Sequence, residues 1–306
     1  MICAVIVSYN PEKISFTDLL IRLCAQVNHI FIVDNSSQEN NDVFHFCQDC
    51  GIDCEKFSLI RLGDNFGVAF ALNVGIQEAM LMQANFILLS DQDSLPDEHM
   101  VCELLRAYKT LTAMGIRVGV IGPTYTDLFT GLTYPFQVKL PGKFFYGHQV
   151  ATKDIPHVES LTLITSGSLI PSHVFQSVGL MRDDLFIDMV DCEWCHRARW
   201  RGYRVFGTGW AKMHQRMGEH RLRIWYLRWR YESAYSPLRI YYRMRNFVAL
   251  WRPHFIDWRW KVRSSWYGLG IVYAHVFFSN YPLETLKMFA KGVWHGLRGK
   301  MGRYPG

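Results

Sequence analysis

Apolar runs and helix-like apolar patterns alternate along the first 122 residues. Continuous apolar runs, typical of strands buried on both faces of a parallel sheet, occur at 2–8, 29–34, 57–62, 86–90 and 118–121. Helical spacing of apolar residues occurs between them, at 16–25, 41–50, 65–83 and 96–114. This alternation with short connections predicts an α/β fold with a doubly wound sheet. Ligands of such sheets bind beyond the carboxyl ends of the strands.

The pattern changes after residue 122, where glycine- and aromatic-rich segments separate the remaining elements. We expect a strand at 161–165 and a helix at 191–201, followed by a basic and aromatic tail. This change divides the chain into a main domain at 1–220, with halves at about 1–122 and 123–220, and a mainly helical extension at 221–306.

Positive charge is concentrated in the C-terminal part of a chain whose formal charge is +6. Between 221 and 263 the acidic residues are Glu232 and Asp257, whereas the basic residues are Arg221, Arg223, Arg228, Arg230, Arg239, Arg243, Arg245, Arg252, Arg259, Lys261 and Arg263. The asymmetry predicts an anionic partner, which could be a membrane surface, phosphate or nucleic acid. Tryptophans among these arginines favour a membrane interface, and they are Trp225, Trp229, Trp251, Trp258 and Trp260. The alternative is a basic helical subdomain that packs on the core.

The start of the chain indicates the compartment. MICAVIVSYN lacks the basic segment of a secretory signal and runs directly into a strand. Eight cysteines then indicate reduced thiols, and the apolar run near 266–278 is shorter than the roughly 20 residues that span a bilayer. We therefore expect a cytoplasmic protein that binds a membrane face peripherally. For the same reason we reject haem attachment at the CEWCH segment, 192–196, because that chemistry accompanies export.

Two carboxylates at the end of the fourth predicted strand are the first candidate for chemistry. Asp91 and Asp93, with Gln92 between them, follow a buried apolar run. Like charges at this spacing repel each other and raise each other's pKa unless a cation neutralises them. Mg²⁺ takes one or two carboxylates and completes its shell with water and substrate phosphate. The alternative is a solvated loop whose acids cap the next helix.

Polar residues at other strand ends extend this candidate site. Asp34 ends the second strand, where an acidic residue often reads a nucleoside, although it could equally cap the following helix. A second group lies at a predicted helix start, where backbone N–H groups can approach a phosphate or sugar, and consists of Arg61, Asn65, Gly67 and Asn73. Close packing of the helix on the sheet also explains the small residues there.

Further along the chain, Asp191 in the first turn of a predicted helix could be a general base or an ordinary helix-capping acid. His214 could complete a metal shell or be structural. Cys47, Cys50 and Cys54 with His45 offer zinc ligands, but helical spacing favours small apolar thiols.

Seven segments together resemble one enzyme family. They are AVIVSYNP (4–11), IVDNSS (32–37), RLGDNFGVAFALNVGI (61–76), LLSDQDS (88–94), TSGSLIP (165–171), LFIDMVDCEWCHRARWRGY (185–203) and YYRMRN (241–246). Over roughly residues 1 to 250 the chain resembles inverting glycosyltransferases of family 2, which have the GT-A fold, and more narrowly bacterial rhamnosyltransferases that use dTDP-L-rhamnose. The resemblance makes 1–122 the nucleotide-sugar half and 123–220 the acceptor half.

The resemblance implies roles for individual residues. Asp34 matches the residue that reads the base, and Asp191 matches the base that activates the acceptor. The implied donor contacts are Tyr9, Asp34, Arg61, Asn65, Asn73, Asp91 and Gln92. The implied ligands of Mg²⁺ or Mn²⁺ are Asp93, Asp91 and His214. The implied acceptor contacts are Ser166, Gly167, Glu193 and Trp194.

The chain departs from the family pattern at one position. Many members have an acidic pair where this chain has Val190 and Asp191, so we expect the base at Asp191, with Glu193 as the alternative. The Gln-x-x-Arg-Trp motif of processive synthases is absent after Asp191, which favours a single transfer.

The resemblance also implies the substrates. The expected reaction moves L-rhamnose onto a glycan, such as a lipid-diphosphate-linked intermediate of O antigen or another cell-surface polysaccharide. The alternative donors are UDP-galactofuranose and UDP-hexose. A nucleic-acid-binding protein is the rival of another class, but it leaves the strand-end carboxylates unexplained. The oligomeric state stays open.

Overall fold

The computed structural model describes every residue except 37–42, 44, 47–53, 129–130, 216–220 and 227. The helix expected at 41–50 and the alternative zinc ligands Cys47 and Cys50 lie mostly or wholly outside the described residues. The expected domain boundary at 220 also falls there, and it stays a prediction.

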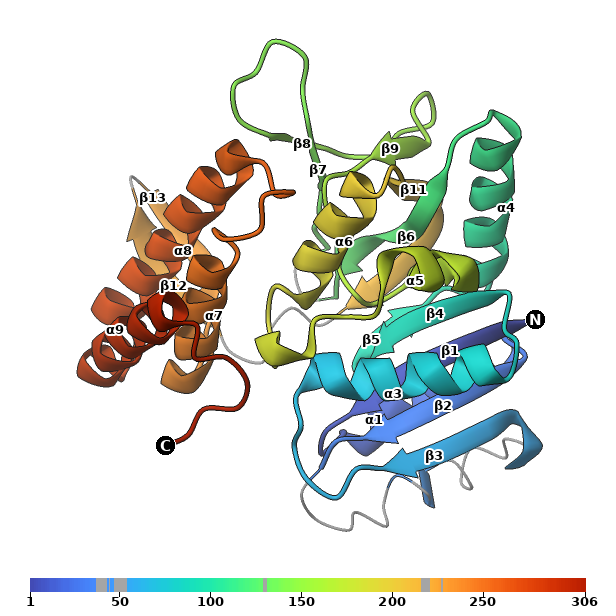
Figure 1. Cartoon of the computed structure of the whole chain (residues 1–306), viewed down its shortest axis with the longest axis horizontal. Helices are drawn as coiled ribbons and strands as arrows, with labels where there is room; N and C mark the ends of the chain where they lie inside the picture. Colours follow the sequence, from blue (N-terminus) through green and yellow to red (C-terminus); the bar gives the residue numbers. More distant parts are fainter. Residues whose placement is uncertain (37–42, 44, 47–53, 129–130, 216–220, 227) are drawn as a thin grey trace.

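A large mixed sheet forms the centre of the main part (Figure 1). Its strands, in spatial order, are β3 (Phe57–Arg61), β2 (His29–Asp34), β1 (Ile2–Ser8), β4 (Phe86–Asp91), β10 (Ser168–Pro171), β6 (Val118–Asp127), β11 (Arg204–Gln215) and β5 (Ser94–Pro96). β1 to β4 run parallel, β10 runs antiparallel to β4 and β6, and β9 (His157–Glu159) pairs with β11. The α/β class predicted from the hydrophobic pattern is therefore confirmed.

Helices cover both faces of the sheet, because its central strands are apolar on both sides. α1 (Lys13–Cys24) and α4 (Met100–Ala113) bury their apolar faces in one core, with Leu19 and Leu104 fully buried. α3 (Val68–Leu81), α5 (Ser172–Val178) and α6 (Val190–Trp200) bury theirs in the other. α3 lies so close to β1 that a Cβ at Gly75 would be 2.4 Å from a methyl group of Val5. This contact explains the small residues of that helix.

Small elements complete the main part. The short helical turns are η1 (Cys54–Lys56) and η2 (Asp183–Leu185), and the short strands β7 (Phe136–Val138) and β8 (Gly147–Gln149) pair with each other. The strand expected at 161–165 is wrong: this segment has no regular structure, and the strand is β10, slightly later in the chain. The segment crosses between layers, and the Leu161 N–H donates to the Gln137 carbonyl 2.7 Å away instead of joining the sheet.

The C-terminal extension is mainly helical, as predicted, but begins with a hairpin. β12 (Arg221–Tyr226) pairs with β13 (Arg228–Ser233), and three helices follow: α7 (Pro237–Ala249), α8 (Trp258–Phe278) and α9 (Pro282–Arg298). Figure 1 shows these helices grouped beside the sheet. α9 lies against α7 so closely that a Cβ at Gly292 would be 2.5 Å from the Tyr241 carbonyl oxygen. Within the described residues, none of the helices is long and apolar enough to cross a membrane.

Candidate active site

The carboxyl ends of three parallel strands meet at one edge of the sheet. β1 ends at Ser8, β2 at Asp34 and β4 at Asp91. The turn after β4 is fixed by buried hydroxyl groups: the Asp91 N–H donates to Ser166 Oγ at 3.1 Å, and the Ser166 and Ser94 hydroxyls are 2.5 Å apart. Ser166, expected to contact the acceptor, therefore supports the backbone that carries Asp91.

The charges of two carboxylates act on a third at this edge. The pKa of Asp91 is raised to about 7, mainly by burial and then by the negative charges of Asp93 and Asp191. Burial is also the main cause that raises the pKa of Asp191. Asp91, Asp93 and Asp191 therefore lie close enough for their charges to interact, and their division into donor and acceptor sides of one site stays a prediction.

This carboxylate cluster fits a divalent cation. Two acidic side chains that raise each other's pKa are stabilised by a cation, and oxygen ligands suit Mg²⁺ and Mn²⁺. Within the part of the chain that the structure describes, no group of three His, Cys, Asp or Glu side chains has the arrangement of a complete metal site. A cation held by Asp93 and Asp91 would therefore need oxygen atoms of substrate or water as further ligands.

Asp191 is presented by a turn with unusual backbone geometry. It lies in the first turn of α6, where its Oδ1 accepts the N–H of Cys192 at 2.7 Å. Just before it, Phe186, Asp188 and Met189 have φ values of 66°, 64° and 65°, a region that costs energy for residues with a Cβ. Such a turn persists only when its surroundings hold it.

Two fully buried residues of α7 hold this turn. Asn246 Nδ2 donates to the carbonyl oxygens of Leu185, Ile187 and Asp188 at 3.0, 2.7 and 2.9 Å. Arg245 Nη2 donates to the Leu185 carbonyl at 2.8 Å, and its Nη1 donates to the Gly302 carbonyl. The C-terminal extension therefore positions the loop that carries Asp191. Sequence analysis missed this role, although both residues belong to the YYRMRN segment.

The donor-side residues form a polar rim around the strand ends. Tyr9 and Gln92 exchange hydrogen bonds: the Tyr9 N–H donates to Gln92 Oε1 at 2.6 Å, and Gln92 Nε2 donates back to the Tyr9 carbonyl at 3.2 Å. Asp34 is buried, and its Oδ1 accepts the Ser36 N–H at 3.1 Å. Asn65 Oδ1 accepts from the amide of Asn35 at 3.1 Å. Arg61, the register partner of Asp34 across β2 and β3, is exposed.

Other expected substrate contacts instead hold the fold. Asn73 makes two hydrogen bonds to the backbone of Met181, at 2.8 and 2.9 Å. Glu193 is buried against Arg197 at 2.9 Å, and the Trp194 indole donates to the Gly179 carbonyl at 2.9 Å. We therefore assign Asn73, Glu193 and Trp194 to the core, which leaves Asp191 as the candidate base.

Gly167 supports the same backbone as Ser166. Its φ is +77°, and an added Cβ would be 2.6 Å from the ring of Pro123. A side chain is therefore excluded there, and Gly167 acts through the close approach of its backbone. Its N–H donates to the Leu89 carbonyl at 2.8 Å, which ties this turn to β4.

His214 lies apart from the carboxylate cluster. Its Nε2 is 3.4 Å from Asp97 Oδ1, whereas the next residue, Gln215, donates to Asp91 Oδ2 at 3.4 Å. Alternation along β11 places these neighbours on opposite faces. The metal-shell role expected for His214 is thus not seen in this arrangement, and Gln215 is the residue of β11 that reaches the cluster.

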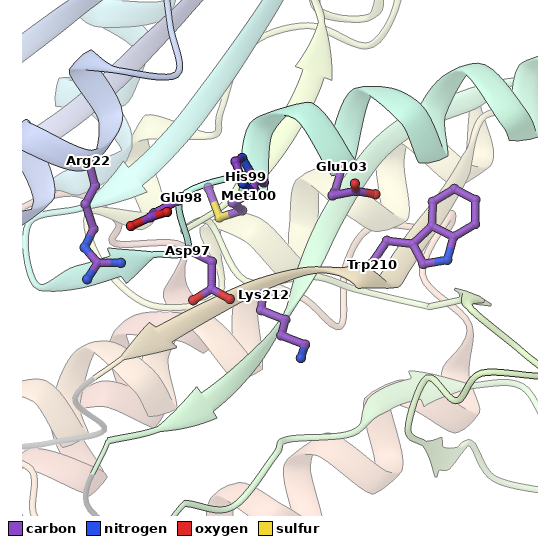
Figure 2. A pocket seen from close by; sticks show the side chains of 8 residues that line it. All are labelled: Arg22, Asp97, Glu98, His99, Met100, Glu103, Trp210 and Lys212. Carbon is purple, nitrogen blue, oxygen red and sulfur yellow. The ribbon is translucent and has the colours of Figure 1, made fainter.

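A pocket of about 530 Å³ lies beside β11, which contributes Trp210 and Lys212 to its lining (Figure 2). Its lining includes Asp97, and the remaining residues are Arg22, Glu98, His99, Met100, Glu103, Trp210 and Lys212. None of the clustered carboxylates lines it, and its own charges are mixed. We therefore do not assign substrate to this pocket.

Comparisons with known proteins agree with this geometry. The family model described as glycosyl transferase family 2 matches residues 3–160. The chain is 30% identical over 302 residues to the dTDP-rhamnosyl transferase RfbF of Shigella flexneri. The matched residues make up 98% of this chain and 97% of that protein.

Solved structures share the fold at low sequence identity. GalNAc-T7 with UDP, GalNAc and Mn²⁺ has a TM-score of 0.54 at 13% identity and covers 70% of this chain and 43% of its own. S. aureus TarS has a TM-score of 0.53 at 13% identity, and the match covers 97% of this chain and 48% of the TarS chain. The TarS 1–349 complex with UDP-GlcNAc has a TM-score of 0.53 at 14% identity, and the match covers 97% of this chain and 80% of the TarS 1–349 chain. The chain thus spans less than half of the first two.

The raised pKa of Asp91 predicts a pH-dependent stability. Its folded pKa, about 7, exceeds the ordinary value of 3.8, so this group lowers stability as pH rises between these values, by at most about 4 kcal/mol. Asp91→Asn removes the effect. Thermal denaturation without metal should show that the variant's melting temperature, relative to wild type, rises from pH 5 to pH 8. An unchanged difference would contradict the coupling.

The buried amide of Asn246 predicts a joint loss of stability and activity. Asn246→Ala leaves three carbonyl groups without their donor and should cost roughly 2 to 4 kcal/mol of unfolding free energy. Urea denaturation measures this. Turnover of the folded fraction should also fall, because the loop before Asp191 loses its support. Asn28→Ala, which removes a 2.7 Å bond to the Ile2 N–H, is the control and should lower stability alone.

Proposed function

Because the chain belongs to glycosyltransferase family 2, we propose that it transfers L-rhamnose from dTDP-L-rhamnose to a glycan acceptor with inversion at the anomeric carbon. The single observation that carries the proposal is the proximity of Asp93 and Asp191 to Asp91 at one sheet edge, where their charges raise its pKa. Identity along nearly the whole length to a dTDP-rhamnosyl transferase supports the donor.

Donor and acceptor would occupy opposite sides of the carboxylate cluster. Asp34, at the end of β2, would contact the thymine base, and the rim of Tyr9, Gln92 and Asn65 would bind the rest of the nucleotide. Asp93 and Asp91 would hold Mg²⁺ or Mn²⁺, whose charge offsets the negative charge on the leaving diphosphate. Such a cation would lower the pKa of Asp91, which burial and, after it, the charges of Asp93 and Asp191 raise to about 7.

Asp191 would take the proton of the acceptor hydroxyl. Burial raises its pKa above the ordinary value, which makes it a stronger base once it is deprotonated. Attack by the hydroxyl oxygen on the face opposite the diphosphate breaks the bond to the leaving group directly. A single displacement of this kind inverts the configuration, and the family assignment supports it.

The C-terminal extension would bring the enzyme to a lipid-linked acceptor. We propose that the acceptor is a lipid-diphosphate-linked glycan used for cell-surface polysaccharide, and that the enzyme binds the inner membrane face peripherally. Exposed aromatic side chains support this, since Trp258, Trp266 and Phe277 of α8 are 53%, 72% and 68% exposed. Trp260, expected in that surface, is buried at 4% exposure, and its indole donates to Gln137 Oε1.

Several basic residues expected on an outer surface instead make contacts within the protein. Arg239 and Arg243 lie near Asp188, Arg245 is fully buried, and the Lys261 Nζ donates to two backbone carbonyls. This arrangement removes much of the basic surface that a nucleic-acid-binding protein would need. We therefore propose no nucleic-acid partner.

Two variants and a donor panel test the proposed reaction. Asp191→Asn should lower kcat by about 10² to 10⁴ while dTDP-rhamnose with Mn²⁺ still raises the melting temperature, because the donor side is intact. Asp93→Ala should lose both rhamnose transfer and the rise in melting temperature with dTDP-rhamnose and Mn²⁺. Release of dTDP in the presence of acceptor measures transfer. Stabilisation by UDP-sugars, with none by dTDP-rhamnose, would overturn the donor.

Exposed aromatic residues of α8 predict membrane retention. Trp266→Ser together with Phe277→Ser should lower co-sedimentation with anionic phospholipid vesicles by at least about tenfold, because two apolar side chains no longer leave water. Leu81→Ser on α3, at 76% exposure, is the matched control and should sediment like wild type. Equal sedimentation of the double variant and wild type would show that this face does not bind membrane.

A further inference from the structure

Two arginines of α7 share one carboxylate beside the active site. Arg239 Nε lies 3.3 Å from Asp188 Oδ2, and Arg243 Nη1 lies 4.0 Å from Asp188 Oδ1. The arginines are four residues apart on a helix and therefore lie on the same face. Two like charges held this close, and partly withdrawn from water, favour an anion between them.

Asp188 satisfies this pair only loosely. Charge-assisted bonds between arginine and carboxylate are usually about 2.7 to 2.9 Å long. The Arg197–Glu193 pair reaches 2.9 Å, whereas the bonds from Arg239 to Asp188 are 3.3 and 3.4 Å. The Nε atom of Arg243, whose side chain is 13% exposed, has no hydrogen-bond partner. The donors of both guanidinium groups are therefore incompletely used.

The pair lies beside the turn that carries Asp191, because Asp188 is part of that turn. Burial and neighbouring carboxylates raise the pKa of Asp91, and the charge of Arg239 opposes that rise. Burial also raises the pKa of Cys192, the residue after Asp191, and Arg243 opposes it. Asp188 lies three residues before Asp191, so an anion bound by both arginines would adjoin the turn that carries the candidate base.

The scaffold of the pair is rigid. Asn246 Nδ2 donates to the Asp188 carbonyl at 2.9 Å, which fixes the backbone of the shared carboxylate. The ring of Tyr235 lies against both guanidinium groups, 5.3 Å from Arg239 Cζ and 4.8 Å from Arg243 Cζ. Preorganised guanidinium forks of this kind lose little entropy when they bind an oxyanion.

We propose that Arg239 and Arg243 form a binding site for a substrate diphosphate. Two planar forks can each contact the oxygen atoms of one phosphate group, and a diphosphate offers enough acceptors for both. Given the proposed function, two sources supply this chemistry: the donor nucleotide and a lipid-diphosphate-linked acceptor. The site itself rests on the arrangement of the arginines, and not on the identity of the sugar.

A direct titration tests the site without catalysis. Inorganic pyrophosphate is titrated into the full-length protein in EDTA, which removes any metal route to diphosphate. Arg239→Gln and Arg243→Gln should each weaken binding by about tenfold or more, and Arg243→Lys should weaken it less. Arg298→Gln is the matched control, since Arg298 is exposed and stacks on Trp294 at 4.0 Å, and it should bind like wild type.

Melting temperatures separate binding from folding. Arg239 is 46% exposed, so Arg239→Gln should stay folded and gives a test even if Arg243→Gln does not. If the arginines only hold Asp188, the variants lose stability but bind pyrophosphate like wild type, and the proposal fails. It also fails if wild type binds pyrophosphate no better than the folded variants.

A second titration identifies the source of the diphosphate. Pyrophosphate is titrated into wild type that is saturated with dTDP and Mn²⁺. Loss of the arginine-dependent binding assigns the site to the donor diphosphate, and retention assigns it to the acceptor diphosphate; both support the site. If rhamnose transfer were absent, the proposed function would fail, while the difference between wild type and the arginine variants in EDTA would still stand.

Discussion

Repulsion among carboxylates at the edge of the sheet is the constraint on which the rest of the site depends. Asp91 and Asp191 are drawn out of water, and Asp93 adds a third negative charge. The cost appears as the raised pKa of Asp91, to which burial contributes most and the charges of Asp93 and Asp191 add. A cation and a sugar nucleotide would convert this cost into binding, because the same charges that repel each other attract a metal bound to diphosphate.

The C-terminal extension is part of this site and does more than carry it to an acceptor. α7 holds the turn before Asp191 through Asn246, and it places Arg239 and Arg243 against Asp188 in the same turn. Both sets of contacts come from one helix that packs against α9. The unit that the sequence separates as an extension is therefore joined to the turn before Asp191 by buried hydrogen bonds.

Much of the fold could be predicted from hydrophobic periodicity, because the central strands are buried on both faces. The strands at 2–8 and 29–34 match β1 and β2, whose apolar runs leave no other reading. Prediction failed where burial came from tertiary packing. Residues 161–165 contain three apolar side chains but join no strand ladder, and the hairpin β12–β13, although its Arg-Leu-Arg-Ile and Arg-Trp-Arg-Tyr runs alternate as strands do, lies in a segment expected to be mainly helical.

The sequence by itself determined which chemical groups follow the strands: Asp34, Asp91 and Asp93 come at ends that parallel pairing must align. Only the tertiary structure decided which of the polar residues are occupied by contacts within the protein. Asn73, Glu193 and Trp194 turn into the core, and His214 and Gln215 divide between opposite faces of β11. The reason is physical, since strand alternation and helix rotation direct a side chain according to what packs against it. That information lies in contacts between distant segments.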